Sequence, residues 1–390
     1  MELGTSEPSR LLLLLLLSWT ATAAYDYYDD YTANTTDAAD VQLTWPPGLC
    51  PRAMPSATII RNDTVFLMLP AAAWLQLDSP LITTALPVFY ILIFLVGLPS
   101  NALALWVLAT RVEMLPSTIF LMNLAAADLL LGLLLPLKIS YYLLGNHWPF
   151  GEGLCRFTTV AFYGNMYCSL LLLACISVDR HLAVAYPFFA RSCRSTAFAV
   201  STCAVVWAMA ALFTLPLALL RQSFPLLHTQ RTLCHDALPY ENDATYYHHY
   251  FLTLLACGFL APLLVLALCS GGTLWVLLGK GEKYATAIKL TALVLVSVVA
   301  LYTPSHVLLL LHYSHACLEV RSTLYVAYMV SLAVSTCNSC VDPFIYYYVS
   351  EEFRAKVKGR LFGRQHRKGS AISLKTCKET LPTKNSQSLV

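Results

Sequence analysis

From residue 81 onward, long apolar runs alternate with short polar breaks along most of the chain. We place these runs at 81–109, 117–144, 154–185, 196–220, 246–278, 286–312 and 322–348. Each exceeds the roughly 20 apolar residues that a helix needs to cross a bilayer, and none alternates as a membrane β-strand does. A composition of 57% hydrophobic and 12% charged residues does not fit an ordinary soluble domain. The sequence therefore predicts an all-α membrane protein, a seven-transmembrane helix bundle.

Basic residues collect in alternate polar breaks and set the orientation of the bundle. They are Arg111, Arg180, Arg191, Arg194, Lys280, Lys283 and the basic residues of 354–368. Lys and Arg accumulate in cytoplasmic loops, and an odd number of crossings then leaves the N-terminus outside. We expect a multi-pass plasma-membrane protein with a cytoplasmic C-terminus. Because the basic residues share no soluble face, nucleic acid is not an expected partner.

The segment before the bundle has the pattern of a secreted N-terminus. A short leucine run at 11–17 precedes small residues at 21–23, so residues 1–23 are typical of a signal peptide. Residues 24–80 would then be extracellular and show no helical periodicity. Asn34 and Asn62 begin Asn-x-Thr sites, so we expect both to be glycosylated.

The bundle, residues 81–349 in this division, is followed by two further segments. Residues 350–363 have a basic and an apolar face, which predicts an amphipathic eighth helix lying on anionic membrane lipid. Residues 364–390 are rich in Ser, Thr and Lys and predict a disordered cytoplasmic tail.

Several polar residues lie at lipid depth, where such groups usually serve function. They are Asp128, Ser169, Asn338, Ser339, Asp342 and Tyr346. An Asp among hydroxyls and amides can hold a proton or a small cation such as sodium. A hydrogen-bonded contact that joins the helices explains the same residues. Both interpretations remain open, and no other cofactor or metal is expected.

Taken together with other landmarks, these residues resemble the rhodopsin-like G-protein-coupled receptors. The landmarks are Asn101, Leu124-Ala-Ala-Ala-Asp128, Cys155, Asp179-Arg180-His181, Trp207, Pro262, Pro304 and Asp342-Pro-Phe-Ile-Tyr346. The resemblance implies a disulfide between Cys155 and Cys234, and contact of Arg180 with a heterotrimeric G protein. Asp179 would hold Arg180 at rest, and arrestin would bind the phosphorylated tail. It implies a receptor rather than an enzyme.

The outer loops are similar to those of the protease-activated (thrombin) receptors. Cys234-His-Asp-Ala-Leu-Pro239, Lys138-Ile-Ser-Tyr-Tyr142 and Ala161-Phe-Tyr-Gly-Asn-Met-Tyr167 carry this similarity. The implied ligand-binding residues are Tyr142, Tyr163, His235, Asp236, Leu238, His312, Tyr313, Tyr325 and Tyr328. The chain departs from the receptor pattern at three switch positions, which hold Ser270, Tyr284 and Tyr302.

This resemblance implies activation by an extracellular serine protease that cuts after an arginine. Residues 24–80 contain only Arg52 and Arg61 as basic residues, and Pro51 favours the extended shape that fits a protease cleft. Cutting after Arg52 exposes a tethered ligand, Ala53, Met54, Pro55, Ser56, Ala57 and Thr58. The new ammonium needs an anion, for which Asp236 is the candidate. The family leads us to expect signalling through phospholipase C, calcium and Rho, with a role in blood coagulation and haemostasis.

Other functions fit the sequence less well. An opsin needs a lysine in its last helix, and residues 322–348 contain none. We find neither the paired broken helices of a transporter nor the motif of an intramembrane hydrolase. A related receptor for a soluble peptide or nucleotide, with Arg52 incidental, remains the alternative. A second outer disulfide between Cys50 and Cys317 also remains open.

Overall fold

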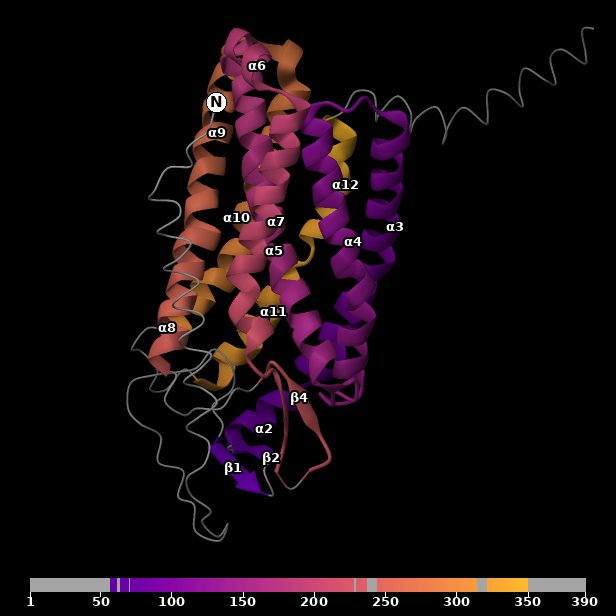
Figure 1. Ribbon diagram of the computed structural model, residues 1–390, viewed down its shortest axis with the longest axis vertical. Coiled ribbons are helices and arrows are strands. Elements are labelled where there is room, and N and C mark those ends of the chain that lie inside the picture. The colour runs from indigo at the N-terminus through magenta and orange to yellow at the C-terminus, as the bar shows by residue number, and fades with distance from the viewer. Residues whose placement is uncertain are drawn as a thin grey trace, which may run out of the picture.

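The computed structural model describes residues 57–61, 64–69, 71–227, 229–236, 244–313 and 321–349. Its main body is an elongated bundle of helices lying side by side (Figure 1). The long helices are α3 (Leu86–Arg111), α4 (Pro116–Leu143), α5 (Gly151–Ala185), α7 (Thr196–Leu219), α9 (Ala261–Leu278) and α10 (Ala285–Tyr313). Short α8 (Ala244–Thr253) leads into α9, and η3 (Glu282–Tyr284) precedes α10. Helix α5 packs against α4, α7 and α9 and lies at the centre.

Six helical segments among the described residues are long and apolar enough to cross a membrane. The seventh crossing, predicted as one helix over 322–348, is divided into α11 (Arg321–Ser335) and α12 (Asn338–Val349). At the break, the Ser335, Thr336 and Ser339 hydroxyls donate to backbone carbonyls within their own turns. Asn101 of α3 donates to the Ser339 carbonyl at 2.6 Å. Polar groups therefore satisfy the interrupted backbone inside the bundle, as lipid requires.

Two helices follow a wider π-helical turn that ends two residues before a proline. The turn η1 (Leu81–Ala85) precedes Pro87 in α3, and η2 (Leu254–Leu260) precedes Pro262 in α9. Proline lacks the N–H that would continue the regular ladder, so the preceding turn adjusts its hydrogen bonding. The predicted run 246–278 is thus a helix with a local change of pitch.

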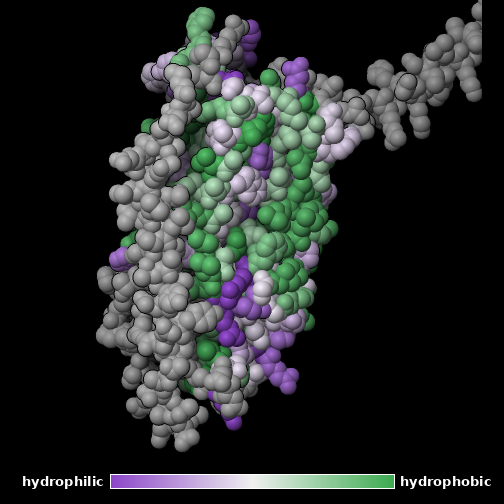
Figure 2. Space-filling view, in the orientation of Figure 1, coloured by the Kyte–Doolittle hydropathy of each residue, from purple (hydrophilic) through white to green (hydrophobic). Residues whose placement is uncertain are grey.

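The outer surface of the bundle is apolar over its middle. Figure 2 shows hydrophobic residues gathered there and hydrophilic residues toward the two ends of the visible face. Leu264, Leu268 and Trp275 of α9 project outward, and Trp275 is 82% exposed. In water such a surface would be unfavourable, so these side chains are placed to contact lipid.

Two small β-hairpins and a short helix form a layer at one end of the bundle, opposite α6 (Pro187–Cys193) (Figure 1). The hairpins are β1 (Ala57–Arg61) with β2 (Thr64–Met68), and β3 (Ser223–Pro225) with β4 (Thr232–Cys234). Helix α2 (Ala71–Leu77) follows β2. Residues 24–80 were predicted without helical periodicity, and α2 corrects that prediction. Its Ala73 and Leu77, with Leu67 and Leu69 before them, are buried in the common core.

Candidate functional site

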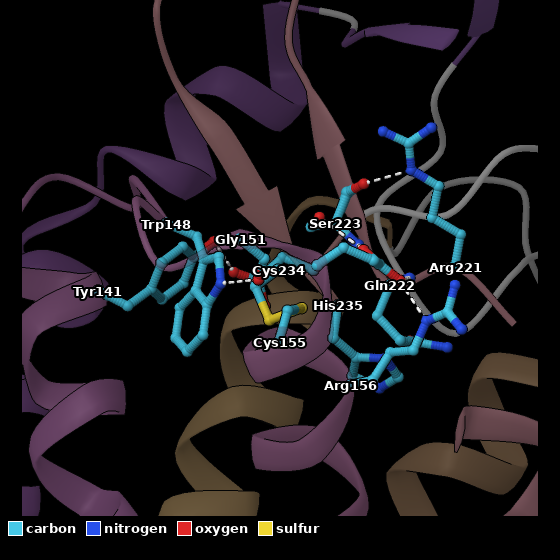
Figure 3. Close-up of a disulfide and its surroundings, with 12 residues drawn as sticks. Tyr141, Trp148, Gly151, Cys155, Arg156, Arg221, Gln222, Ser223, Cys234 and His235 are labelled. Carbon is cyan, nitrogen blue, oxygen red and sulfur yellow. Dashed lines mark hydrogen bonds and ion pairs between the residues drawn. A yellow bond between two sulfur atoms is a disulfide. The ribbon is translucent and has the colours of Figure 1, made fainter. Parts of the chain in front are cut away.

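A disulfide joins Cys155, in the first turns of α5, to Cys234 of β4, with 5.7 Å between the Cα atoms. This pairing confirms the one implied by the resemblance. Trp148 lies beside it (Figure 3), where its Nε1 donates to the Gly151 carbonyl at 2.8 Å. The Trp148 backbone N–H donates to the Thr232 carbonyl at 2.8 Å. The disulfide and these bonds hold β4 against the start of α5.

Glu152 fastens the other strand of this hairpin to the same helix. Its carboxylate accepts the backbone N–H groups of Gln222 at 2.8 Å and Ser223 at 2.7 Å, and the Ser223 hydroxyl at 2.6 Å. Arg156, one turn along α5, pairs with it at 2.5 Å. No sequence signal assigns a role to Glu152, because the strand residues that it binds lie about 70 residues away.

Asp236 lies beneath the loop and is only 4% exposed. The Tyr141 hydroxyl donates to its Oδ2 at 2.5 Å. Burial raises the pKa of Asp236 to about 6, against the opposing effects of the Tyr141 hydrogen bond and the Lys138 charge. The predicted anion is therefore present but already hydrogen-bonded, so an incoming ammonium must compete with Tyr141.

Several predicted ligand-binding residues gather around Asp236. Tyr142, Tyr163 and His235 line with it a cavity of about 40 Å³. The Tyr163 and His235 rings meet edge-on at 5.4 Å, and His235 Nδ1 lies 2.6 Å from Gln222 Oε1. A cavity of this size holds only a few water molecules. A peptide terminus can enter only if the loop or the surrounding helices move.

Tyr325 of α11 also interacts with Asp236, and the remaining predicted residues lie outside this group. Tyr325 and Tyr328 of α11 are buried, and Tyr328 borders a second cavity of about 10 Å³ that Tyr163 and His306 also line. His312 and Tyr313 end α10. Leu238, residues 52–56 and Asn62 of the predicted sites lie outside the described residues. So do Asn34, Cys50, Cys317 and the predicted eighth helix.

Two buried carboxylates lie among the mid-bundle polar residues. Asn165 donates to Asp128 Oδ1 at 3.2 Å and contacts Ser169 Oγ at 3.4 Å. Asn338 donates to Asp342 Oδ2 at 2.7 Å, and the Asp128 carboxyl group contacts both the Asp342 carboxyl group and the Tyr346 hydroxyl. Asp128 Oδ2, Asp342 Oδ1 and Tyr346 Oη are buried without a hydrogen bond of standard geometry. Asn165 was not predicted as a member of this group. The Ser339 hydroxyl, which was predicted, donates to the Thr336 carbonyl.

The Asp179-Arg180-His181 motif lies near the opposite end of α5. Arg180 lines a cavity of about 510 Å³ between α5, α9 and α10, with Ser177, Ser270 and Thr273 among its neighbours. Both Asp179 oxygens accept hydrogen bonds from Arg194, a partner that no sequence motif indicated.

His181 packs directly on α9. Its Nδ1 lies 3.3 Å from Thr273 Oγ1. A Cβ at Gly272 would lie 2.7 Å from the His181 ring, so only glycine permits this approach. Beyond the motif, α6 carries Phe188 and Phe189, which are 88% and 57% exposed. This end thus combines the cavity around Arg180 with an exposed aromatic pair.

Comparison with known proteins places this arrangement among receptors. Residues 100–346 match the seven-transmembrane receptor (rhodopsin family) model. Proteinase-activated receptor 4 of Mus musculus is 52% identical, over 80% of this chain and 78% of that receptor. The Homo sapiens receptor 4 is 51% identical, over 80% and 81%. Proteinase-activated receptor 3 of Bos taurus is 39% identical, over 77% and 78%. The likeness to the fourth subtype was already carried by Leu115-Pro-Ser-Thr118 and Trp148-Pro-Phe-Gly-Glu152.

Proposed function

The chain belongs to the rhodopsin family of seven-transmembrane receptors and, within it, to the proteinase-activated receptors, and on that basis we propose that a serine protease activates it by cutting after Arg52. The new N-terminus, starting at Ala53, is then a tethered ligand for the same receptor. The observation that carries this proposal is the Pro51-Arg52 pair in a segment with only one other basic residue, Arg61. The similarity to proteinase-activated receptors supports the same mode of activation.

The buried loop cluster supports a role in receiving the ligand. The ammonium of Ala53 is a cation that needs a carboxylate, and Asp236 is the acidic residue lining the cavity under the loop. Tyr141 would give up its hydrogen bond to Asp236 as the ammonium arrives. Tethering makes this binding intramolecular, at an effective concentration on the order of millimolar. A peptide with weak intrinsic affinity can therefore fill the site.

The opposite end of the bundle supports coupling to a heterotrimeric G protein. Arg180 and the hydroxyls around it line a cavity open enough to admit a protein segment, and Phe188 offers an exposed apolar contact beside it. We expect calcium release through phospholipase C, and Rho activation, to follow. Arrestin at the phosphorylated tail and lipid at 350–363 complete the proposed partners.

The protease belongs to the thrombin or trypsin type, because these enzymes cut after arginine. Only Asp63 and Asp78 lie as acidic residues between Arg52 and the first membrane helix. Thrombin binds acidic segments through a basic exosite, and little acid is offered here. We therefore expect activation by thrombin to require a high enzyme concentration.

We also propose that sodium binds between Asp128 and Asp342. Each carboxylate has one buried oxygen without a hydrogen bond of standard geometry, and a hard cation takes oxygen ligands of this kind. The Ser169 hydroxyl and the side-chain oxygen Oδ1 of Asn338 lie in the same group. When bound, the ion would neutralise charge that the lipid interior otherwise disfavours. Replacing sodium by choline in a thermal-unfolding assay should lower the Tm of the receptor but not of its Asp128→Asn variant.

Two variants test the cleavage assignment. Arg52→Gln should abolish the calcium response to protease, whereas Arg61→Gln should leave it unchanged. Both variants should respond normally to a soluble Ala-Met-Pro-Ser-Ala-Thr peptide, which bypasses cleavage. Loss of the protease response in Arg61→Gln alone would move the ligand to Asn62. A full protease response from both variants would favour a receptor for a soluble ligand.

A further inference from the structure

The strand β2 is bound to the loop that carries the disulfide. Leu67 forms a parallel β-bridge with Leu226, and the Leu227 N–H donates to the Leu67 carbonyl at 2.8 Å. Leu67 and Leu226 are 0% and 1% exposed. Hydrogen-bonded backbone and a buried leucine pair therefore fix β2 in place.

The chain that follows β2 is fixed as well. At the end of α2, the Leu77 carbonyl accepts from Asn146 Nδ2 at 2.7 Å. Asp78 pairs with Arg231 at 2.6 Å, and the Arg231 guanidinium lies 5.8 Å from the Trp74 ring. From Leu67 to Asp78, the chain is thus anchored to the outer loops before it enters the bundle.

The strand β1 is held differently. Among the described strands it pairs only with β2, from Ala57↔Met68 to Arg61↔Thr64. A two-stranded hairpin is only marginally stable by itself. Yet Ala57 and Thr58, the last two residues of the proposed ligand, are part of this strand. The pairing therefore occupies one end of the peptide that would enter the receptor.

The registers show that the paired strand cannot deliver the ligand. The β1–β2 and β3–β4 registers, with the Leu67↔Leu226 bridge between them, place Arg61, Thr64, Ser223 and Cys234 in one row across the layer. Ala57 lies three strand spacings and four residues from Cys234, or about 20 Å. Ala53 can extend only about 13 Å from Ala57. Its ammonium falls short of Cys234, and Asp236 lies two residues further along the chain.

We propose that β2 is the anchor of the tethered ligand, and that the cleaved N-terminus reaches its site only when β1 separates from β2. This proposal rests on the proposed function. With Thr64 as the fixed point, the chain back to Ala53 can extend about 36 Å. Two strand spacings, together about 10 Å, separate Thr64 from Cys234. Leu67 is a positioning residue, because it sets where the released chain begins. The β1–β2 pairing keeps the cut peptide from its site until the hairpin opens.

A disulfide between strands tests this separation. Ala57→Cys with Met68→Cys joins a facing pair at the start of β1 and leaves four residues after the cut. Ile60→Cys with Val65→Cys joins a facing pair in the same hairpin but leaves seven residues free after the cut. These residues can extend about 23 Å, whereas residue 60 lies about 15 Å from Cys234. Peptide mapping without reduction would verify each bond, and the single cysteine variants control for the substitutions.

The two disulfide variants should behave oppositely. The 57–68 variant should be cut normally after Arg52, yet need at least about tenfold more protease for a half-maximal calcium response, as loss of tethering implies. The 60–65 variant should respond like its single variants, and both should respond fully to the soluble peptide. A normal protease response from the 57–68 variant, with Arg52 still required, would overturn the anchor proposal alone. A response that did not require Arg52 would overturn the proposed function instead.

A milder variant tests the anchor itself. Leu227→Pro removes the N–H that donates to the Leu67 carbonyl and leaves the pair of Leu67 and Leu226 in place. It should weaken the protease response by about three- to tenfold, because a looser anchor lowers the effective concentration, and leave the soluble-peptide response unchanged. Leu75→Ser is the matched control, because Leu75 of α2 is 80% exposed. Equal protease responses from Leu227→Pro and this control would contradict the role of β2.

Discussion

Arg194 binds both carboxylate oxygens of Asp179, with Nε 2.6 Å from Oδ1 and Nη2 2.7 Å from Oδ2. Asp179 is 6% exposed and belongs to α5, whereas Arg194 caps α6, where its N–H donates to the Ala190 carbonyl at 3.0 Å. Parallel bonds of this kind between two ions are among the stronger polar contacts in proteins. They hold the helix that carries Phe188 against the end of α5.

Removing this contact should weaken coupling to the G protein. Arg194→Gln leaves the largely buried Asp179 carboxylate without its paired charge, which costs about 1–3 kcal/mol. We expect a lower Tm and a reduced maximal calcium response to soluble peptide, with peptide affinity retained. Lys280→Gln removes an exposed cytoplasmic charge and should change neither quantity. An unaltered maximal response in Arg194→Gln would show that α6 keeps its place without the pair.

Arg180 should be required for signalling and not for folding. It lines the cytoplasmic cavity between α5, α9 and α10, where a partner protein would meet its charge. Arg180→Ala should therefore reach the cell surface in nearly normal amounts and give no G-protein response to protease or peptide. Surface labelling and a calcium assay measure the two effects separately. Normal calcium release from this variant would refute the assignment.

Ligand binding should depend on pH through Asp236. Burial raises its pKa to about 6, although Tyr141, Lys138 and Tyr325 act in the opposite direction. A raised carboxyl pKa favours the folded state at low pH, and this contribution is lost as pH rises through about 6. Binding an ammonium needs the ionised form, so the potency of the soluble peptide should fall as pH drops from 7.4 to 5.5.

Two variants separate this titration from a general effect of acid. Asp236→Asn should bind weakly at both pH values, because it cannot ionise. His235→Gln keeps Asp236 and should retain the fall in potency, which places the titrating group on the carboxylate. A pH-independent potency in the unmodified receptor would remove Asp236 from the binding step.

The Cys155–Cys234 disulfide should be needed for the outer layer to form. It closes a loop with a sequence separation of 79 residues, and a loop of that length is stabilised by about 4 kcal/mol when crosslinked. Cys155→Ser should sharply reduce surface expression and peptide binding. Cys257→Ser, which removes a free exposed thiol, should be neutral. Full peptide response in Cys155→Ser would mean that Glu152 and Trp148 alone hold the hairpin.

Much of this protein followed from the sequence because the relevant signals are local. Apolar runs of sufficient length predict membrane helices wherever they occur, and the basic residues between them set the orientation. The resemblance supplied the partner of Cys155, and it is the source of the roles proposed for Arg180 and Asp236. In each of these cases, neighbouring residues or a short motif held the information.

Tertiary structure alone decided contacts between distant segments. Asn165 of α5 donates to Asp128 of α4, and Glu152 binds a strand some 70 residues away. Leu67 pairs with Leu226 in the outer layer. None of these has a periodicity or spacing of its own, because each depends on how packed helices bring unrelated segments together. The apolar character of each residue can be seen in the sequence. A polar pair exists only where the fold places both partners within hydrogen-bonding distance.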